Sequence, residues 1–158
     1  MSKIPVNTQN RISKKFQTRL NKLITEEDLD LKEFSKKVNI SVPVIRMASL
    51  YGFIPSVKVL IKIADYGELS FDYLIGRTDK NDFFGSYVQS DFIARYTILR
   101  NEKGVNDSQV ANRMPFTRNY ISEWKRNKTL PSLDYLIALA EYFNVSIDFL
   151  LGRTDIKN

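Results

Sequence analysis

Apolar residues recur at spacings of three and four along most of the chain, which is the period of helices with one buried face. The first run predicts a helix that starts at residue 12 and ends near the acidic stretch 26–30. Its apolar members are Ile12, Phe16, Leu20, Leu23 and Ile24. Residues 1–11 show no such period and are expected to form a flexible arm. The pattern therefore predicts an all-α protein.

Residues that can cap helices divide the rest of the first half. Asp30, with a glutamate three positions later, predicts one helix start, and Ser41 predicts another for a helix that runs through Leu50. Pro43 falls in the first turn of that helix, where proline is tolerated.

Residues 106–132 predict two short helices joined by a tight turn. Asn106, with a glutamine three positions later, caps the first helix, and Pro115 ends it. Thr117 is expected to cap the second helix. Its inward residues, three apart, are Ile121 and Trp124. Five basic residues and one acidic residue lie between 113 and 128, mostly on the outward face. Charge alone supports two interpretations equally: an ordinary helix face exposed to solvent, and a helix face that binds an anion.

An internal repeat relates the two halves. Residues 55–79 and 131–155 align without gaps at an offset of 76, and 13 of the 25 positions carry the same residue. Carried backwards, the offset preserves the apolar pattern, so each repeat is predicted to form a five-helix domain. The expected organisation is an arm at 1–11, a first domain at 12–79, a linker at 80–89 and a second domain at 90–155.

The repeat also predicts how helices four and five of each domain begin and end. Serine is expected to cap both helices, and glycine to end the fifth. These residues are Ser56, Ser70 and Gly76 in the first repeat and Ser132, Ser146 and Gly152 in the second. The linker aromatics are expected to pin the two domains together. They are Phe83, Phe84 and Tyr87.

The second repeat carries a recognisable order of residues. It begins with a small residue at 111, apolar residues on either side of the turn at 114 and 116, and the cap at 117. It continues with Ile121, a Pro-Ser pair at 131–132 and the segment VSIDFLLG at 145–152. This order resembles the phage-repressor or XRE type of helix-turn-helix domain. The resemblance implies two tandem lambda-repressor-like domains, a double-stranded DNA partner and a role in transcription regulation.

The resemblance also indicates which residues face DNA. We expect base contacts from Arg118, Asn119, Tyr120 and Glu123. We expect phosphate contacts from Ser108, Gln109, Arg113, Thr117, Arg126, Asn127 and Lys128. Two positions depart from the family pattern. Asp107 stands where the family usually has glutamine and is expected to repel phosphate, and Pro115 replaces the usual glycine, so the turn is expected to be reshaped.

In the first repeat the corresponding outward face is apolar. It is formed by Val42, Val44, Met47 and Leu50. We expect an exposed patch through which the protein forms a homodimer. The alternatives are that the domain buries these side chains itself, or that the two repeats of one monomer pair with each other.

Composition narrows the function further. The formal charge of +6 and the pI near 9.5 favour an anionic partner such as nucleic acid. The chain has no cysteine and no histidine, which argues against disulfides, thiol or imidazole chemistry and zinc sites. We expect no enzyme activity, cofactor, metal or small-molecule substrate. No apolar stretch has signal-peptide or membrane-span length, so a cytoplasmic protein with no membrane partner is expected.

The predicted function is sequence-specific transcription regulation. The alternative is a protein-interaction adaptor or antitoxin-like module on the same fold.

Overall fold

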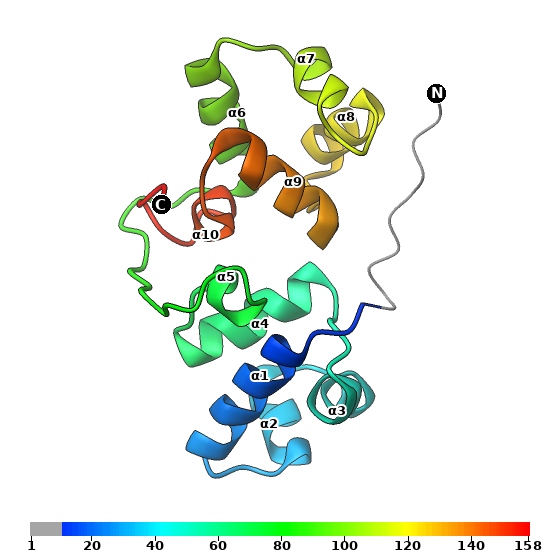
Figure 1. Cartoon of the computed structure of the whole chain (residues 1–158), viewed down its shortest axis with the longest axis vertical. Coiled ribbons are helices and arrows are strands. Elements are labelled where there is room, and N and C mark those ends of the chain that lie inside the picture. Colours follow the sequence, from blue (N-terminus) through cyan, green and yellow to red (C-terminus); the bar gives the residue numbers. More distant parts are fainter. Residues whose placement is uncertain (1–10) are drawn as a thin grey trace. The chain divides into compact units, whose positions relative to one another are not determined.

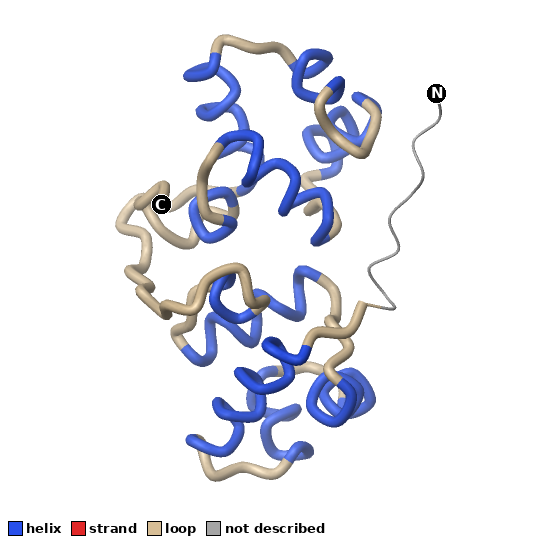
Figure 2. Tube along the Cα trace, viewed as in Figure 1, coloured by secondary structure: helices blue, strands red, loops and turns tan. Residues whose placement is uncertain are grey.

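The computed structural model describes residues 11–158, and these divide into two compact units, 11–83 and 84–158. Both units are helical (Figures 1 and 2). Within the described residues, β-type pairing is limited to one bridge between Ile12 and Phe53. The all-α prediction is confirmed. The expected arm lies outside the described residues except for Arg11, whose carbonyl accepts a hydrogen bond of 2.9 Å from the amide of Ile54.

Each unit contains five helices. The first unit has α1 (Lys14–Glu26), α2 (Leu31–Val38), α3 (Val42–Tyr51), α4 (Val57–Gly67) and α5 (Phe71–Leu74). The second has α6 (Phe92–Lys103), α7 (Asp107–Asn112), α8 (Arg118–Asn127), α9 (Leu133–Phe143) and α10 (Ile147–Leu150). Adding 76 to the bounds of α3, α4 and α5 gives the bounds of α8, α9 and α10.

Helix α1 has the buried face that its apolar spacing predicted. Phe16, Leu20, Leu23 and Ile24 are all buried. Ile12 is not part of this helix and is 62% exposed, because Ser13 caps α1 by accepting a hydrogen bond from the amide of Phe16. The predicted start at residue 12 was therefore wrong by two residues.

Most of the predicted helix caps are confirmed. Asp30 and Asn106 each form a complete capping box with the residue three positions later. The hydroxyls of Ser56, Ser70 and Ser146 each accept a hydrogen bond from a first-turn amide. Gly76 and Gly152 follow the fifth helices with positive φ, as expected.

Three predicted side-chain caps are absent. Ser41, Thr117 and Ser132 occupy N-cap positions, but their hydroxyls make no cap hydrogen bond. In each case the residue's backbone carbonyl accepts the first bond of the helix instead.

An arginine closes each unit, buried in the second and half-buried in the first, and sequence reasoning missed both. Arg95 on α6 is 4% exposed and donates to the carbonyl oxygens of Phe149 and Thr154 and to the carboxylate of Asp155. In the first unit Arg19 makes the matching contacts, to Tyr73, Thr78 and Asp79. Each arginine also stacks on an aromatic ring. These bonds tie the first helix of each unit to its fifth helix and to the residues that follow it.

The linker is held by polar contacts at both of its ends. The side-chain oxygen of Asn81 accepts a hydrogen bond of 2.8 Å from the amide of Ser70, and Asp155 accepts from the hydroxyl of Ser86 and the amide of Tyr87. The Phe84 side chain is 64% exposed and that of Tyr87 is 99% exposed. Hydrogen bonds within each unit therefore hold the two ends of the linker. That the linker aromatics pin the two domains together stays a prediction.

Candidate nucleic-acid interface

Helix α8 is fixed to its domain by aromatic packing on its inward side. Ile121 is fully buried and Trp124 is 3% exposed, as their spacing predicted. The Trp124 ring meets Phe92 and Phe116 edge-on, with ring centroids 5.6 and 5.0 Å apart. Rings held from two directions cannot rotate freely, so the outward face of α8 is presented on a rigid base.

Tyr120 lies at the edge of this aromatic cluster. Its ring is 5.2 Å from that of Tyr135 and 6.2 Å from that of Phe116. Burial and a hydrogen bond with Tyr120 raise the pKa of Tyr135. Tyr120 is 38% exposed, so part of its side chain packs in the cluster and part remains accessible.

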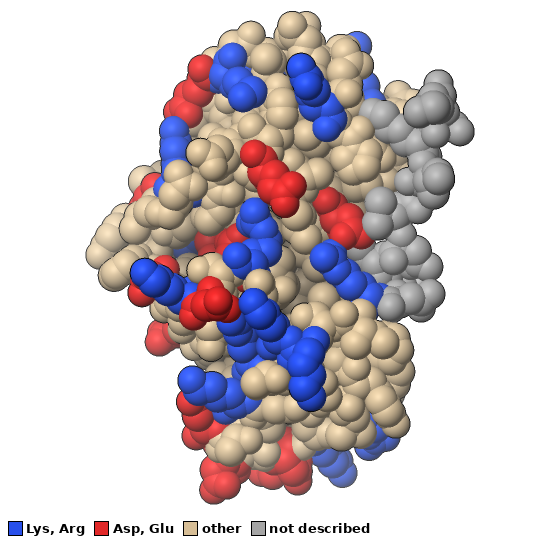
Figure 3. All heavy atoms as spheres, in the orientation of Figure 1, with Lys and Arg blue, Asp and Glu red and all other residues tan. Residues whose placement is uncertain are grey.

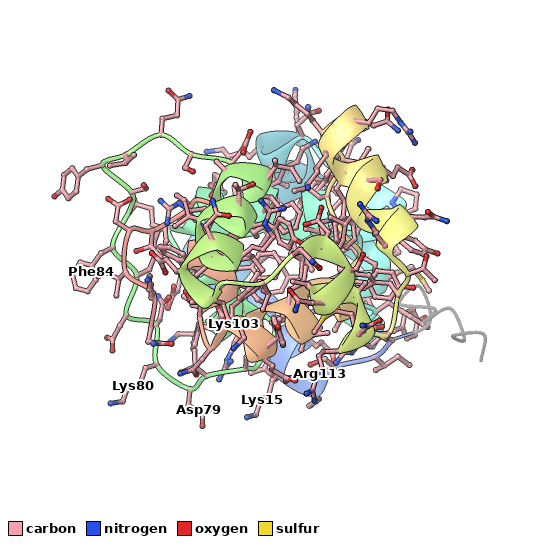
Figure 4. All side chains as sticks on the ribbon, turned by 90° about the horizontal axis from the view of Figure 1, so that it is seen from above. Lys15, Asp79, Lys80, Phe84, Lys103 and Arg113 are labelled. Atoms are coloured by element: carbon pink, nitrogen blue, oxygen red, sulfur yellow. The ribbon has the colours of Figure 1, made fainter. Side chains whose placement is uncertain are left out.

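The other expected DNA contacts are all exposed. They are Arg118, Asn119 and Glu123 for bases, and Ser108, Gln109, Arg113, Thr117, Arg126, Asn127 and Lys128 for phosphates. The Arg113 side chain extends away from the ribbon (Figure 4). Seven of these ten residues lie on α8 or at its two caps.

The turn before α8 is reshaped, as expected from Pro115. In the first unit the corresponding residue, Asn39, is left-handed with φ 55° and caps α2. Proline is restricted to negative φ. Helix α7 accordingly ends at Asn112, and the chain turns through Arg113, whose amide donates to the carbonyl oxygen of Val110 at 3.0 Å.

Asp107 is the centre of an ionic network between α6, α7 and α8. Its carboxylate accepts hydrogen bonds of 2.8 Å from the Tyr96 hydroxyl and from Arg100, and it is also paired with Lys125. Burial alone would raise the pKa of Asp107, but the hydrogen bonds from Lys125, Arg100 and Tyr96 outweigh it and lower the pKa to about 2. Two cations therefore balance the charge of Asp107, which the sequence reasoning did not foresee. Its expected repulsion of phosphate stays a prediction.

Lys128 ends α8 in a conformation that disfavours a side chain. Its φ of 52° and ψ of 35° are left-handed. The matching residue after α3 is Gly52, which adopts φ 76° without a Cβ penalty. A lysine therefore occupies a position where the backbone conformation favours glycine.

The outward face of α3 is apolar and accessible. Met47 is 42% exposed and Leu50 is 53% exposed, while Val42 and Val44 are half-buried. In this structure the domain does not bury these side chains itself, which was one alternative reading of the sequence.

Net charge does not distinguish the two units. Residues 11–83 contain 13 basic and 10 acidic residues, and residues 84–158 contain 10 and 8. On the face shown in Figure 3, basic side chains gather over the first unit around α1, whose sequence includes Lys14, Lys15, Arg19 and Lys22. What differs is the outward face of the third helix in each unit, which is polar in α8 and apolar in α3.

Comparison with known proteins identifies the class of the second unit. Residues 98–150 match the helix-turn-helix family, so this unit contains a helix-turn-helix domain. The match covers α7 and α8 with their supporting helices and about a third of the chain.

Two curated relatives are transcription regulators by name. The HTH-type transcriptional activator BcrR of Enterococcus faecalis is 29% identical over 66 residues, which is 42% of this chain and 32% of its own length. The HTH-type transcriptional regulator ImmR of Bacillus subtilis is 29% identical over 58 residues, which is 37% of this chain and 46% of its own length. The chain thus spans less than half of either relative. No solved structure gives a significant match. Within residues 11–158, no helix is long and apolar enough to cross a membrane.

Proposed function

We propose that the protein is a cytoplasmic, sequence-specific DNA-binding transcription regulator. Two tandem five-helix helix-turn-helix domains, 12–79 and 90–155, are joined by the linker 80–89. The second domain reads the major groove with α8, and the first joins two copies of the chain. The helix-turn-helix match and the names of both relatives support the DNA-binding class. The shared offset of 76 between the helix bounds supports the tandem arrangement.

The contrast between α8 and α3 is the observation that carries this proposal. Near the start of α8, Arg118 can donate a bidentate pair of hydrogen bonds to guanine, and Asn119 can pair with adenine. Glu123 can accept a hydrogen bond from the amino group of cytosine. These side chains are exposed on a helix whose inner face packs into the domain core through Trp124. At the same positions α3 carries apolar residues, which suit a protein partner.

A selection of bound sequences from a random duplex pool tests the assignment to α8. The wild type should enrich one site. Arg118→Ala should weaken binding to that site by about 1–3 kcal/mol and relax one base position. Lys58→Ala, which removes an exposed charge from the first unit, is the matched control and should enrich the wild-type site. Enrichment of the same site with the same stringency by Arg118→Ala would contradict the assignment.

An adaptor or antitoxin-like module is the second candidate function. The accessible apolar surface of α3 favours it, because such patches usually contact protein. A wild type that enriches no sequence from the pool, and binds duplex DNA no better than the Arg118→Ala variant does, would favour this candidate.

A further inference from the structure

Lys125 is the one basic residue on α8 that the structure shows tied to an acid of another helix. Its ammonium group pairs with one carboxylate oxygen of Asp107, while Arg100 and the Tyr96 hydroxyl bind the other at 2.8 Å each. The side chain of Asp107 is only 13% exposed, whereas that of Lys125 is 37% exposed. The lysine therefore lies at the surface, with its charge directed to an internal anion.

The helix-turn-helix fold does not require this network. At the offset of 76, all four of its positions in the first unit hold other residue types. They are Leu20 for Tyr96, Ile24 for Arg100, Leu31 for Asp107 and Ser49 for Lys125. Leu20 and Ile24 are buried there, and the same helices form around them. The network accompanies the unit with the basic outward face.

We propose that Asp107 is a specificity-determining residue, because it pairs with Lys125 and so withholds this cation from the phosphates of non-cognate DNA. The inference rests on the proposed function of α8. Each phosphate neutralised by lysine or arginine strengthens binding to any sequence, since counterions are released regardless of the bases. A free lysine on the reading helix would thus lower the ratio of specific to non-specific affinity.

Of the two cations, Lys125 is the one that loss of Asp107 would release toward DNA. Arg100 lies on α6, its side chain is 22% exposed, and it has a further hydrogen bond of 3.4 Å to Asn101. Lys125 lies on α8 beside Arg126, which is expected to contact phosphate. Asp107 acts through Lys125 and is a positioning residue.

The test measures the salt dependence of binding to a random-sequence duplex. Four proteins are compared: the wild type, Asp107→Asn, Lys125→Met and the double variant. Asp107→Asn should bind roughly fivefold tighter at 0.1 M salt, with a salt slope steeper by about one unit. Lys125→Met should match the wild type, because its ammonium group is already occupied. The double variant should return to the wild-type slope.

The control has the same change in net charge at another place. Glu141→Gln removes an exposed carboxylate from α9 of the same unit and should leave the salt slope unchanged. Weaker binding of folded Asp107→Asn to both random and selected duplexes would show a purely structural role and overturn the inference. A flatter slope for Lys125→Met alone would also overturn it, since Lys125 would then already contact phosphate. A wild type that binds no duplex DNA would overturn the proposed function itself, and this inference with it.

Discussion

Lys128 adopts a left-handed backbone conformation, and substitutions at this position can measure the backbone strain and the contribution to DNA binding separately. In a left-handed conformation the Cβ of any ordinary residue approaches the following carbonyl oxygen, which costs about 1–2 kcal/mol. Glycine avoids this cost but loses more chain entropy on folding, an offset of about 0.4–1 kcal/mol. At φ 52°, replacing alanine by glycine at this position should therefore stabilise the second unit by about 1 kcal/mol.

Comparison of Lys128→Gly with Lys128→Ala isolates that conformational effect, because both variants lose the same charge. Trp124 is the only tryptophan of the chain and is buried in the second unit, so its fluorescence follows the urea unfolding of that unit. Lys128→Gly should be about 1 kcal/mol more stable than Lys128→Ala, a difference of roughly 5 °C in Tm for a unit of this size.

The DNA-binding measurement on the same two variants should show no such difference. Both should weaken binding to selected and random duplexes alike and lower the salt slope by about one unit, as expected for one lost phosphate contact. Equal stability of the two variants would refute the argument from backbone strain. A salt slope that matches the wild type in both would remove Lys128 from the proposed phosphate contacts.

Three further expectations follow from the packing, the apolar face and the ionic network. Trp124→Ala should destabilise the second unit by about 3–5 kcal/mol, measured by circular dichroism during urea unfolding; an unchanged midpoint would contradict its role in the core. Sedimentation at micromolar concentration should show a wild-type dimer and a folded monomer for Val44→Asp with Met47→Asp, whereas a monomeric wild type or a folded dimeric variant would remove the proposed interface. Because the pKa of Asp107 falls from 3.8 to about 2 on folding, its charge should contribute about 2 kcal/mol above pH 4, and this is lost as the pH falls toward 2. The stability advantage of the wild type over Asp107→Asn should shrink over that range, and an advantage independent of pH would contradict it.

Short-range features of this fold were predictable from the sequence. The spacing of Ile121 and Trp124 placed both in the core, and the pairs that begin at Asp30 and Asn106 marked two helix starts correctly. Each depends on residues three or four positions apart, where helix geometry determines which groups meet.

Features that depend on distant residues were not found by this reasoning. Arg95 bonds to groups 54 to 60 positions away, which no helical period reveals. The offset of 76 pairs it with Arg19 and was the available signal. The ion pairs of Asp107 were not foreseen, because its partners, Arg100 and Lys125, lie on two other helices. The absent side-chain caps of Ser41, Thr117 and Ser132 show a different failure, since the residue type at an N-cap position does not fix the direction of its hydroxyl.

The exposed rings of the linker have a practical consequence for cutting the chain. A protease that cleaves after aromatic residues needs an accessible segment whose backbone can detach from its hydrogen-bond partners. Most other aromatic rings of the described chain are partly or wholly buried. Phe84 is exposed and lies between the two anchored ends of the linker, whereas the amide of Tyr87 is bound to Asp155. A brief digestion should therefore cut first after Phe84 and release fragments that each keep their five helices and closing arginine. Such fragments would allow self-association and DNA recognition to be assigned to one half of the chain or the other without any substitution.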